Sequence, residues 1–418
     1  MVRVCRLVGV LLLVARLCAA YSALTHEAIV DAAWDDSIVP LLRERFPGAT
    51  EDELREAHAY AYGGCIIQDM GYYPFGSALF TELVHYVRSG DFVVALVNES
   101  QSLNDYAFAL GALEHYVADD AGHPLAINHV VPLLYPDLRR KFGNTVTYED
   151  DPPAHLRVEF GFDVLQVARG RYTSEAHKAF IGFKVATQLL EDAFFTTYGL
   201  QVSDLFASED LAIGTYRRTV SQLIPEATQV AWELKQDEIT QAMPGIRREQ
   251  FVYSLSRASY EKEWGTAYER PGCFAKFMAT VLSVVPKIGP FAPLAFRPPT
   301  PEAERLFADS FTASVERYRV LLAEARPGTL QLSDRNLDTG RPPRAGMYSL
   351  LDRAYAQWVE RLDDRDLMRA TPAMRASILT FYDSLATPIA IDDPCAAHCV
   401  RRVLAILRSG APKESPPE

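Results

Sequence analysis

Two pairs of chemically active side chains stand one helical turn apart in otherwise apolar runs. His115 and Asp119 lie in DYAFALGALEHYVADD, and His155 and Glu159 lie in AHLRVEF. Residues four apart on a helix project from the same face. Burying an imidazole and a carboxylate on such a face is costly unless something binds them. Histidine nitrogens and carboxylate oxygens together suit zinc, so the spacing raises the hypothesis of a metal site.

Three further residues of the same kind precede these pairs. His26 lies in YSALTHEAI, Asp69 in GGCIIQDMGYYPFG and His85 in ELVHYVRSG. Seven of the nine histidines fall between positions 26 and 155. A single helical His–Asp pair is more often an ordinary hydrogen-bonded pair. Zinc ligands cluster because each ion needs three or four of them, so the whole set favours zinc.

The elements that must position these residues are helices. Apolar residues recur at three- and four-residue spacing over 78–100, 105–120 and 174–199, and strand-like alternation is nearly absent. The run EDELREAHAYAYGG, residues 51–64, predicts a helix with acids in its first turn and glycines at its end. We predict an all-α protein.

The chain is long enough for two helical units. Proline-rich breaks near 150, 300 and 343 mark loops. The predicted division is a catalytic unit at 21–240, a helical C-terminal extension at 241–410 and a frayed tail at 411–418. The sequence does not indicate what the extension does.

The N-terminus has the order of a secretory signal. MVRVCRLVGVLLLVARLCAA opens with two arginines, continues with a short apolar stretch and ends in small residues. The apolar stretch is too short to span a bilayer. We expect cleavage after Ala20, a mature chain that starts at Tyr21, and export to the periplasm or the medium.

The most apolar stretch outside this leader is 276–296, KFMATVLSVVPKIGPFAPLAF. Its three prolines are incompatible with one continuous transmembrane helix. Burial against the first unit is the default interpretation, and docking onto a lipid surface is the alternative.

Four cysteines remain in the mature chain: Cys65, Cys273, Cys395 and Cys399. Export permits disulfides, and four cysteines allow three pairings. Cys395 and Cys399 flank His398. We favour a local disulfide between the two cysteines, or two packed thiols, over a metal site.

The charge argues against non-specific binding to nucleic acid. The formal net charge is −12, and loss of the three arginines of the leader takes it to −15. A hydrophobic content of 49%, with 11% aromatic residues, is enough for a substantial core rather than a disordered chain.

The order of these ligand-type residues resembles the zinc-dependent phospholipases C, which are related to the fungal single-strand nucleases. The resemblance covers about 21–200. It implies a compact all-α enzyme whose cleft holds three zinc ions, and in which metal-activated water attacks a phosphodiester. It also implies a division of the ligands among the ions. The first ion takes the backbone amine and carbonyl of Tyr21 with His26 and the bridging Asp119, the second takes Asp69, His85, His115 and Asp119, and the third takes His155, Glu159 and one more histidine.

The resemblance leaves the identity of the second histidine at the third ion open. The family has it six residues after the bridging aspartate, where this chain has Leu125. His123 is assigned as the replacement, with His129 as the alternative. The resemblance further implies that Asp69 orients or deprotonates the nucleophile. The amine of Tyr21 must be free and unprotonated to bind zinc, so removal of the leader is a condition for activity.

The metal site alone does not choose a substrate. Glu159 stands where the related nucleases tend to use aspartate, and this favours a phospholipase C that hydrolyses glycerophospholipids to diacylglycerol and a phosphorylated head group. We expect a monomer that meets phospholipid at a membrane or micelle surface, without a transmembrane segment or a stable nucleic acid partner. The alternatives are a nuclease or 3′-nucleotidase, or a non-enzymatic, zinc-stabilised helical binding protein. Aromatic residues that line a head-group site, or simply pack, are Tyr72, Tyr73, Phe75 and Tyr116.

Overall fold

A computed structural model describes the fold of residues 23–72, 75–168, 184–206, 212–214, 240, 297, 299–364, 370–384 and 394–409. Within these residues the chain is helical, and the only extended pairing is an isolated bridge between Asn336 and Arg341. The predicted all-α class is confirmed. The leader, Tyr21, the apolar stretch 276–296 and the tail lie outside the described residues.

The helices of the N-terminal half carry every ligand-type residue predicted from the sequence that the structure describes. In chain order they are α2 (Ala23–Ala33), η1 (Trp34–Ile38), α3 (Val39–Arg45), α4 (Glu51–Ile67), η2 (Gln68–Tyr72), α5 (Ala78–Tyr86), α6 (Ser89–Glu99), α7 (Leu103–Gly122), η3 (His123–Ile127), α8 (Asn128–Leu134), α9 (Pro136–Phe142), α10 (Pro152–Ala168), α12 (Thr187–Tyr198) and η4 (Val202–Asp204). The C-terminal helices are α18 (Pro301–Leu322), α19 (Ser349–Asp364), α20 (Pro372–Asp383) and α21 (Pro394–Ser409). None of the described helices combines the length and the apolar character that a membrane crossing needs.

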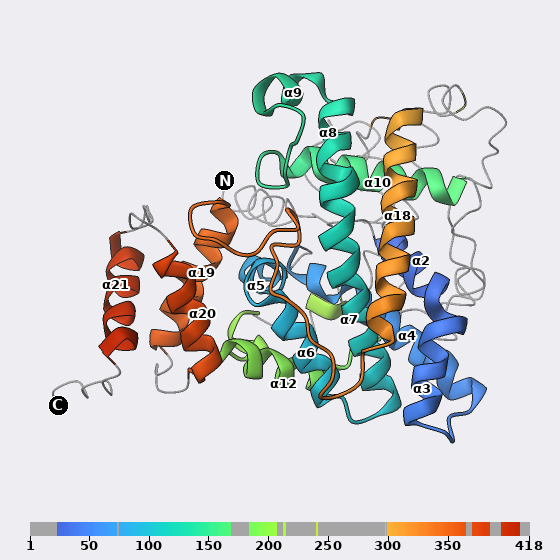
Figure 1. Ribbon diagram of the computed structural model, residues 1–418, viewed down its shortest axis with the longest axis horizontal. Helices are drawn as coiled ribbons and strands as arrows, with labels where there is room; N and C mark the ends of the chain where they lie inside the picture. Colours follow the sequence, from blue (N-terminus) through green and yellow to red (C-terminus); the bar gives the residue numbers. More distant parts are fainter. Residues whose placement is uncertain are drawn as a thin grey trace, which may run out of the picture.

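Helix α7 is the central element of the fold. It begins at a capping box formed by Ser102 and Asp105, and every residue from Tyr106 to Gly122 is buried. A helix that is enclosed on all sides belongs to the interior of a domain. α2, α4, α6 and α18 all pack against it, and Figure 1 shows α7 running through the middle of the molecule beside α18.

The glycines near residue 64 have a different function from the one predicted. The sequence predicted that Gly63 and Gly64 end their helix, but α4 continues through them to Ile67. A Cβ on Gly64 would lie 1.9 Å from the carbonyl oxygen of Phe108, and one on Gly111 would lie 2.0 Å from the carbonyl oxygen of Ala61. The two glycines therefore allow the backbones of α4 and α7 to touch.

The helical run predicted over 78–100 is broken into two helices. α5 ends at Tyr86, and Arg88 has a φ of +52° before α6 starts at Ser89. The left-handed residue is held because the Arg88 guanidinium bonds Asp91 and the backbone oxygen of Thr197. The turn leaves His85 on the last turn of α5, facing the interior.

The C-terminal helices share the hydrophobic core of the N-terminal half. Tyr318 of α18 donates a hydrogen bond to the Leu110 carbonyl of α7 at 2.8 Å, and the Trp358 indole of α19 donates to the Tyr198 carbonyl at 2.8 Å. α19 also packs on α5, and Figure 1 shows α19, α20 and α21 grouped on that side. The domain boundary near 240 stays a prediction.

The helix crossing gives the first test. We expect Gly64→Ala or Gly111→Ala to lower the free energy of unfolding by about 3 kcal/mol, because the added methyl group meets backbone that must move. Gly48 has open space around it, so Gly48→Ala is the matched control and should change the free energy of unfolding by less than about 0.5 kcal/mol. Equal thermal midpoints for all three variants would contradict the close crossing.

Candidate metal centre

The structure brings the predicted ligand side chains into the interior around α7. Each is at most 3% exposed. His26 comes from α2, Asp69 from η2, His85 from α5, His115 and Asp119 from α7, His123 from η3, and His155 and Glu159 from α10. Tyr21 lies outside the described residues, so its backbone ligands stay a prediction.

Four of these side chains converge on one point. The Nε2 atoms of His85 and His115 lie 3.1 Å apart. Oδ2 of Asp119 lies 3.3 Å from Nε2 of His115 and 3.4 Å from that of His85. Oδ1 of Asp69 lies 3.4 Å from the same His85 nitrogen. Two nitrogens and two carboxylate oxygens therefore surround one small volume.

Both histidines of this set have their other nitrogen engaged. Nδ1 of His115 donates to the Cys65 carbonyl at 2.8 Å, and Nδ1 of His85 donates to the Thr81 carbonyl at 2.9 Å. A carbonyl only accepts, so each Nδ1 carries a hydrogen. In the neutral rings both Nε2 lone pairs then face the same volume. A metal-binding histidine normally has this arrangement, with its second nitrogen held by a carbonyl or carboxylate.

The spacing of the four atoms fits a tetrahedral ion. Zinc with ligand bonds of about 2.0–2.1 Å places any two of its ligand atoms about 3.3 Å apart. The observed separations run from 3.1 to 3.4 Å. Hydrogen bonds from ring nitrogen to oxygen are commonly shorter. Oδ1 of Asp69 and both oxygens of Asp119 make no hydrogen bond with the described residues. The donor set fits zinc better than it fits a network of hydrogen bonds.

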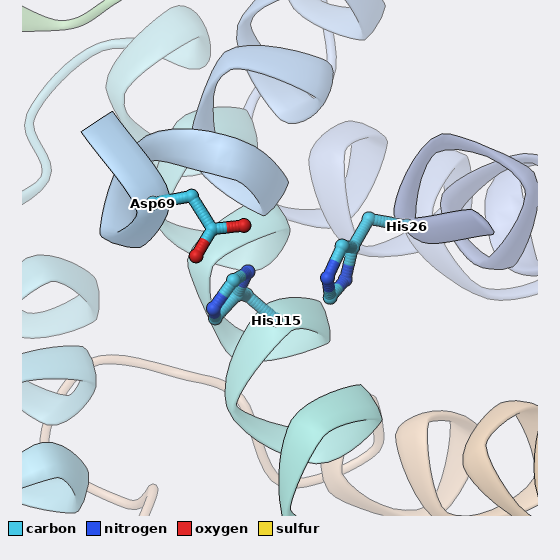
Figure 2. Close-up of side chains that lie close together, drawn as sticks. All are labelled: His26, Asp69 and His115. Carbon is cyan, nitrogen blue, oxygen red and sulfur yellow. The ribbon is translucent and has the colours of Figure 1, made fainter. Parts of the chain in front are cut away.

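His26 approaches the same carboxylates from the other side. Figure 2 shows its ring reaching from α2 toward Asp69 and His115, and the ligand atoms of these three residues lie within 4.8 Å of one another. Nε2 of His26 is 3.6 Å from Oδ1 of Asp119, the oxygen that does not face His85. Asp119 can therefore serve two neighbouring positions, one with each oxygen.

A separate group is formed by side chains of η3 and α10. Ligand atoms of His123, His155 and Glu159 lie within 4.8 Å of one another. Nε2 of His155 donates to the Val146 carbonyl at 2.6 Å, so its Nδ1 is the atom left to bind a metal. That Nδ1 and both Glu159 oxygens make no hydrogen bond with the described residues. His129 is exposed and contacts the Asn144 carbonyl instead. The geometry favours His123 as the histidine of this group.

Burial and neighbouring charge shift the pKa values of Asp69 and Asp119 in opposite directions. Burial raises the pKa of Asp69. Burial alone would also raise the pKa of Asp119, but the surrounding His115 and His123 outweigh it and hold that pKa well below its usual range. Asp119 is thus the permanent anion of the cluster, and Asp69 takes up a proton more readily.

Sequence reasoning missed two carboxylates that contact these histidines. Glu114 is fully buried, and its Oε2 lies 3.1 Å from Nδ1 of His26. A charged residue next to His115 in an apolar helix was an available signal for it. Asp338 lies 3.2 Å from Nδ1 of His123 through its Oδ1. No spacing in the sequence pointed to Asp338, which belongs to the C-terminal extension.

The structure describes three of the four aromatic residues that were candidates for a head-group site. Tyr116 is buried and donates to the Ser333 carbonyl at 2.7 Å, which supports its packing role. Tyr72 lies between His85, at 6.1 Å between ring centroids, and Tyr148, at 5.7 Å. Phe75 is 53% exposed, whereas Tyr73 lies outside the described residues.

The structure describes the side chains of two of these four cysteines, Cys65 and Cys399. Cys65 is buried and contacts the Tyr62 carbonyl. His398 is exposed and belongs to no metal-type group among the described residues. The Cys273 and Cys395 side chains lie outside them, so the disulfide pairing stays a prediction.

The described residues thus form an all-α fold with three buried, partly overlapping groups of histidine and carboxylate side chains that could hold metal ions. Residues 25–207 match the family described as zinc dependent phospholipase C, and this part of the chain is similar to that family. All eight described ligand-type residues fall within the match. Neither the search of curated proteins nor the search of solved structures finds a match.

The charges of the centre predict proton release when zinc binds. Burial lowers the pKa of His85 and of His123, but nearby carboxylates outweigh it and raise the pKa to about 9 and to about 10, respectively. Both rings are then protonated in the metal-free protein at pH 8, and zinc binds only the neutral rings. Calorimetry in buffers of different ionisation enthalpy should show protons released, and the apparent affinity for zinc should weaken as the pH falls. Zinc binding without proton release, at an affinity that does not depend on pH, would contradict the predicted protonation of these two rings.

Proposed function

We propose that the chain is an exported zinc-dependent phospholipase C that hydrolyses glycerophospholipids to diacylglycerol and a phosphorylated head group. The observation that carries the proposal is the set of inter-ligand distances of 3.1–3.4 Å among His85, His115, Asp69 and Asp119. It is supported by the match of 25–207 to a zinc-dependent phospholipase C family. The distances support a zinc site, and the family match supports the reaction.

The proposed centre holds about three ions, given three to four ligands for each. His85, His115, Asp69 and Asp119 hold one. His123, His155 and Glu159 hold a second. His26 and Asp119 hold another together with the amine and carbonyl of Tyr21.

The start of α2 supports this role for the mature N-terminus. Asp163 accepts hydrogen bonds from the Leu24 backbone nitrogen at 3.0 Å and from the Thr25 hydroxyl at 2.6 Å. Asp163 lies one turn after Glu159 on α10, so the first turn of α2 is fixed to the helix that carries a proposed ligand. Leu24, three residues after Tyr21 in the sequence, is therefore held beside the helix that carries Glu159. A retained leader would leave the backbone nitrogen of Tyr21 as an amide, which does not bind zinc in this way.

Bound zinc ions would supply a water of lowered pKa and positive charge for the phosphoryl oxygens. The chain contributes the proton acceptor and the orientation. Asp69 is the candidate base because its raised pKa brings it closer to the pH at which a base works well, whereas Asp119 stays ionised. Tyr72 and Tyr148 place aromatic rings between His85 and His155, where a head group would lie against them.

Asp69 gives the direct test of catalysis. With zinc in excess, we expect Asp69→Asn to lower kcat/KM by at least about 100-fold, because the amide cannot accept the proton of the water. Asp137 is exposed in the first turn of α9, where it pairs with Arg140, so Asp137→Asn is a matched control that should leave kcat/KM unchanged. Parental kcat/KM in Asp69→Asn would contradict a role for this carboxylate in catalysis.

The substrate is tested on mature protein that begins at Tyr21. We expect release of phosphocholine or phosphoethanolamine from mixed micelles of phospholipid and detergent when zinc is supplied, and no cleavage of single-stranded DNA. Cleavage of DNA with the lipids left intact would identify a nuclease. Bound zinc with neither activity would identify a zinc-stabilised binding protein.

A further inference from the structure

The proposed metal centre extends beyond the part of the chain that matches the family. Oδ1 of Asp338 lies 3.2 Å from Nδ1 of His123, and both side chains are 3% exposed. Nε2 of the same ring is directed toward the cluster, 3.7 Å from Oδ1 of Asp119. We propose that Asp338 is a positioning residue that orients His123 for zinc, so that the C-terminal extension completes the centre. This inference rests on the proposed zinc sites and is independent of which phosphodiester is hydrolysed.

Each of the other four histidines is oriented in the same way by a partner within 25–207. The partners are Glu114 for His26 and the carbonyls of Thr81, Cys65 and Val146 for His85, His115 and His155. Such contacts fix the tautomer and the direction of a metal-binding ring. His123 fits this pattern with a partner that comes from the extension.

Asp338 is itself held in place, which a positioning residue requires. Its Oδ2 accepts hydrogen bonds from the Tyr148 backbone nitrogen at 2.9 Å and from the Tyr348 hydroxyl at 2.9 Å. Its Oδ1 lies 3.2 Å from Nδ1 of His123. One oxygen thus anchors the carboxylate while the other is presented to the ligand.

The turn that carries Asp338 is attached to two ligand-bearing segments. The backbone nitrogen of Leu337 donates to the carbonyl of His85 at 3.1 Å. The amide of Asn128, which follows η3, donates to the Asp338 carbonyl at 2.8 Å. Gly340 has a φ of +66°, and a Cβ there would lie 2.9 Å from Cγ of Pro124, the residue after His123. The turn is therefore packed directly on η3.

The same segment offers a matched control. Asp334, four residues earlier, accepts hydrogen bonds from the backbone nitrogens of Gly90 and Asp91 at the start of α6, each at 3.1 Å. It fastens the segment to the catalytic half without touching a proposed ligand. Asp334→Asn and Asp338→Asn make the same chemical change, and only Asp338 faces His123.

The experiment measures zinc rather than activity. Mature parental protein and both variants are equilibrated with a graded series of chelator-buffered zinc, and bound zinc is counted per chain. We expect Asp338→Asn to weaken binding of one of about three ions by roughly 10–100-fold, and Asp334→Asn to leave all of them unchanged. Thermal midpoints in saturating zinc check that both variants fold.

A double-variant comparison separates positioning from general stability. If Asp338 acts through His123, Asp338→Asn adds no further loss of zinc in a His123→Ala background. An additive loss, equal losses in Asp334→Asn and Asp338→Asn, or parental zinc affinity in Asp338→Asn would each overturn the inference. Parental protein that binds no zinc would overturn the proposed centre and this inference with it. Parental protein that binds zinc but hydrolyses no lipid would contradict only the proposed function.

Discussion

Asp69 and Asp119 are carboxylates in the interior of a helical protein, and the architecture around them supplies positive charge. Placing an anion in such an environment costs several kcal/mol unless a partner compensates it. Histidines from α2, α5, α7 and η3 surround them, and the separations of 3.3–3.4 Å from His85 and His115 match ligands of one ion. Because the imidazoles are uncharged when they bind metal, the compensating charge would come from the proposed ions.

The helix packing follows from this requirement. α7 carries His115 and Asp119 on a face that must meet η2, and the contact of α4 with α7 through Gly64 and Gly111 allows that approach. The Cys65 carbonyl, one residue after Gly64, then accepts a hydrogen bond from Nδ1 of His115. The close approach of α4 to α7 thus also places the carbonyl that orients His115.

Part of the site could be predicted because helical spacing is local. Four-residue spacing places His115 with Asp119 and His155 with Glu159 whatever the rest of the chain does. The convergence of His26, Asp69 and His85 on these pairs came from the family order of residues, since spacing alone does not fix distances between helices. The choice between His123 and His129 needed the structure, which buries one ring and exposes the other.

Other features of the fold and site were not predicted from the sequence, for physical reasons. Gly63 and Gly64 were misinterpreted because a glycine pair at a helix end and one at a helix crossing look alike in sequence. Asp338 joins His123 across a large separation along the chain, and no periodicity links such residues. Glu114 offered one signal, as a charged residue beside His115 in an apolar helix, but only the fold shows that it meets His26.

The most direct test of the central claim is anomalous X-ray diffraction at the zinc edge from crystals of mature protein grown with zinc. The account predicts a strong peak between Asp69, His85, His115 and Asp119, about 2.0–2.1 Å from the Nε2 atoms of both histidines. A map with no peak in that volume, while zinc is present elsewhere in the crystal, would contradict the account.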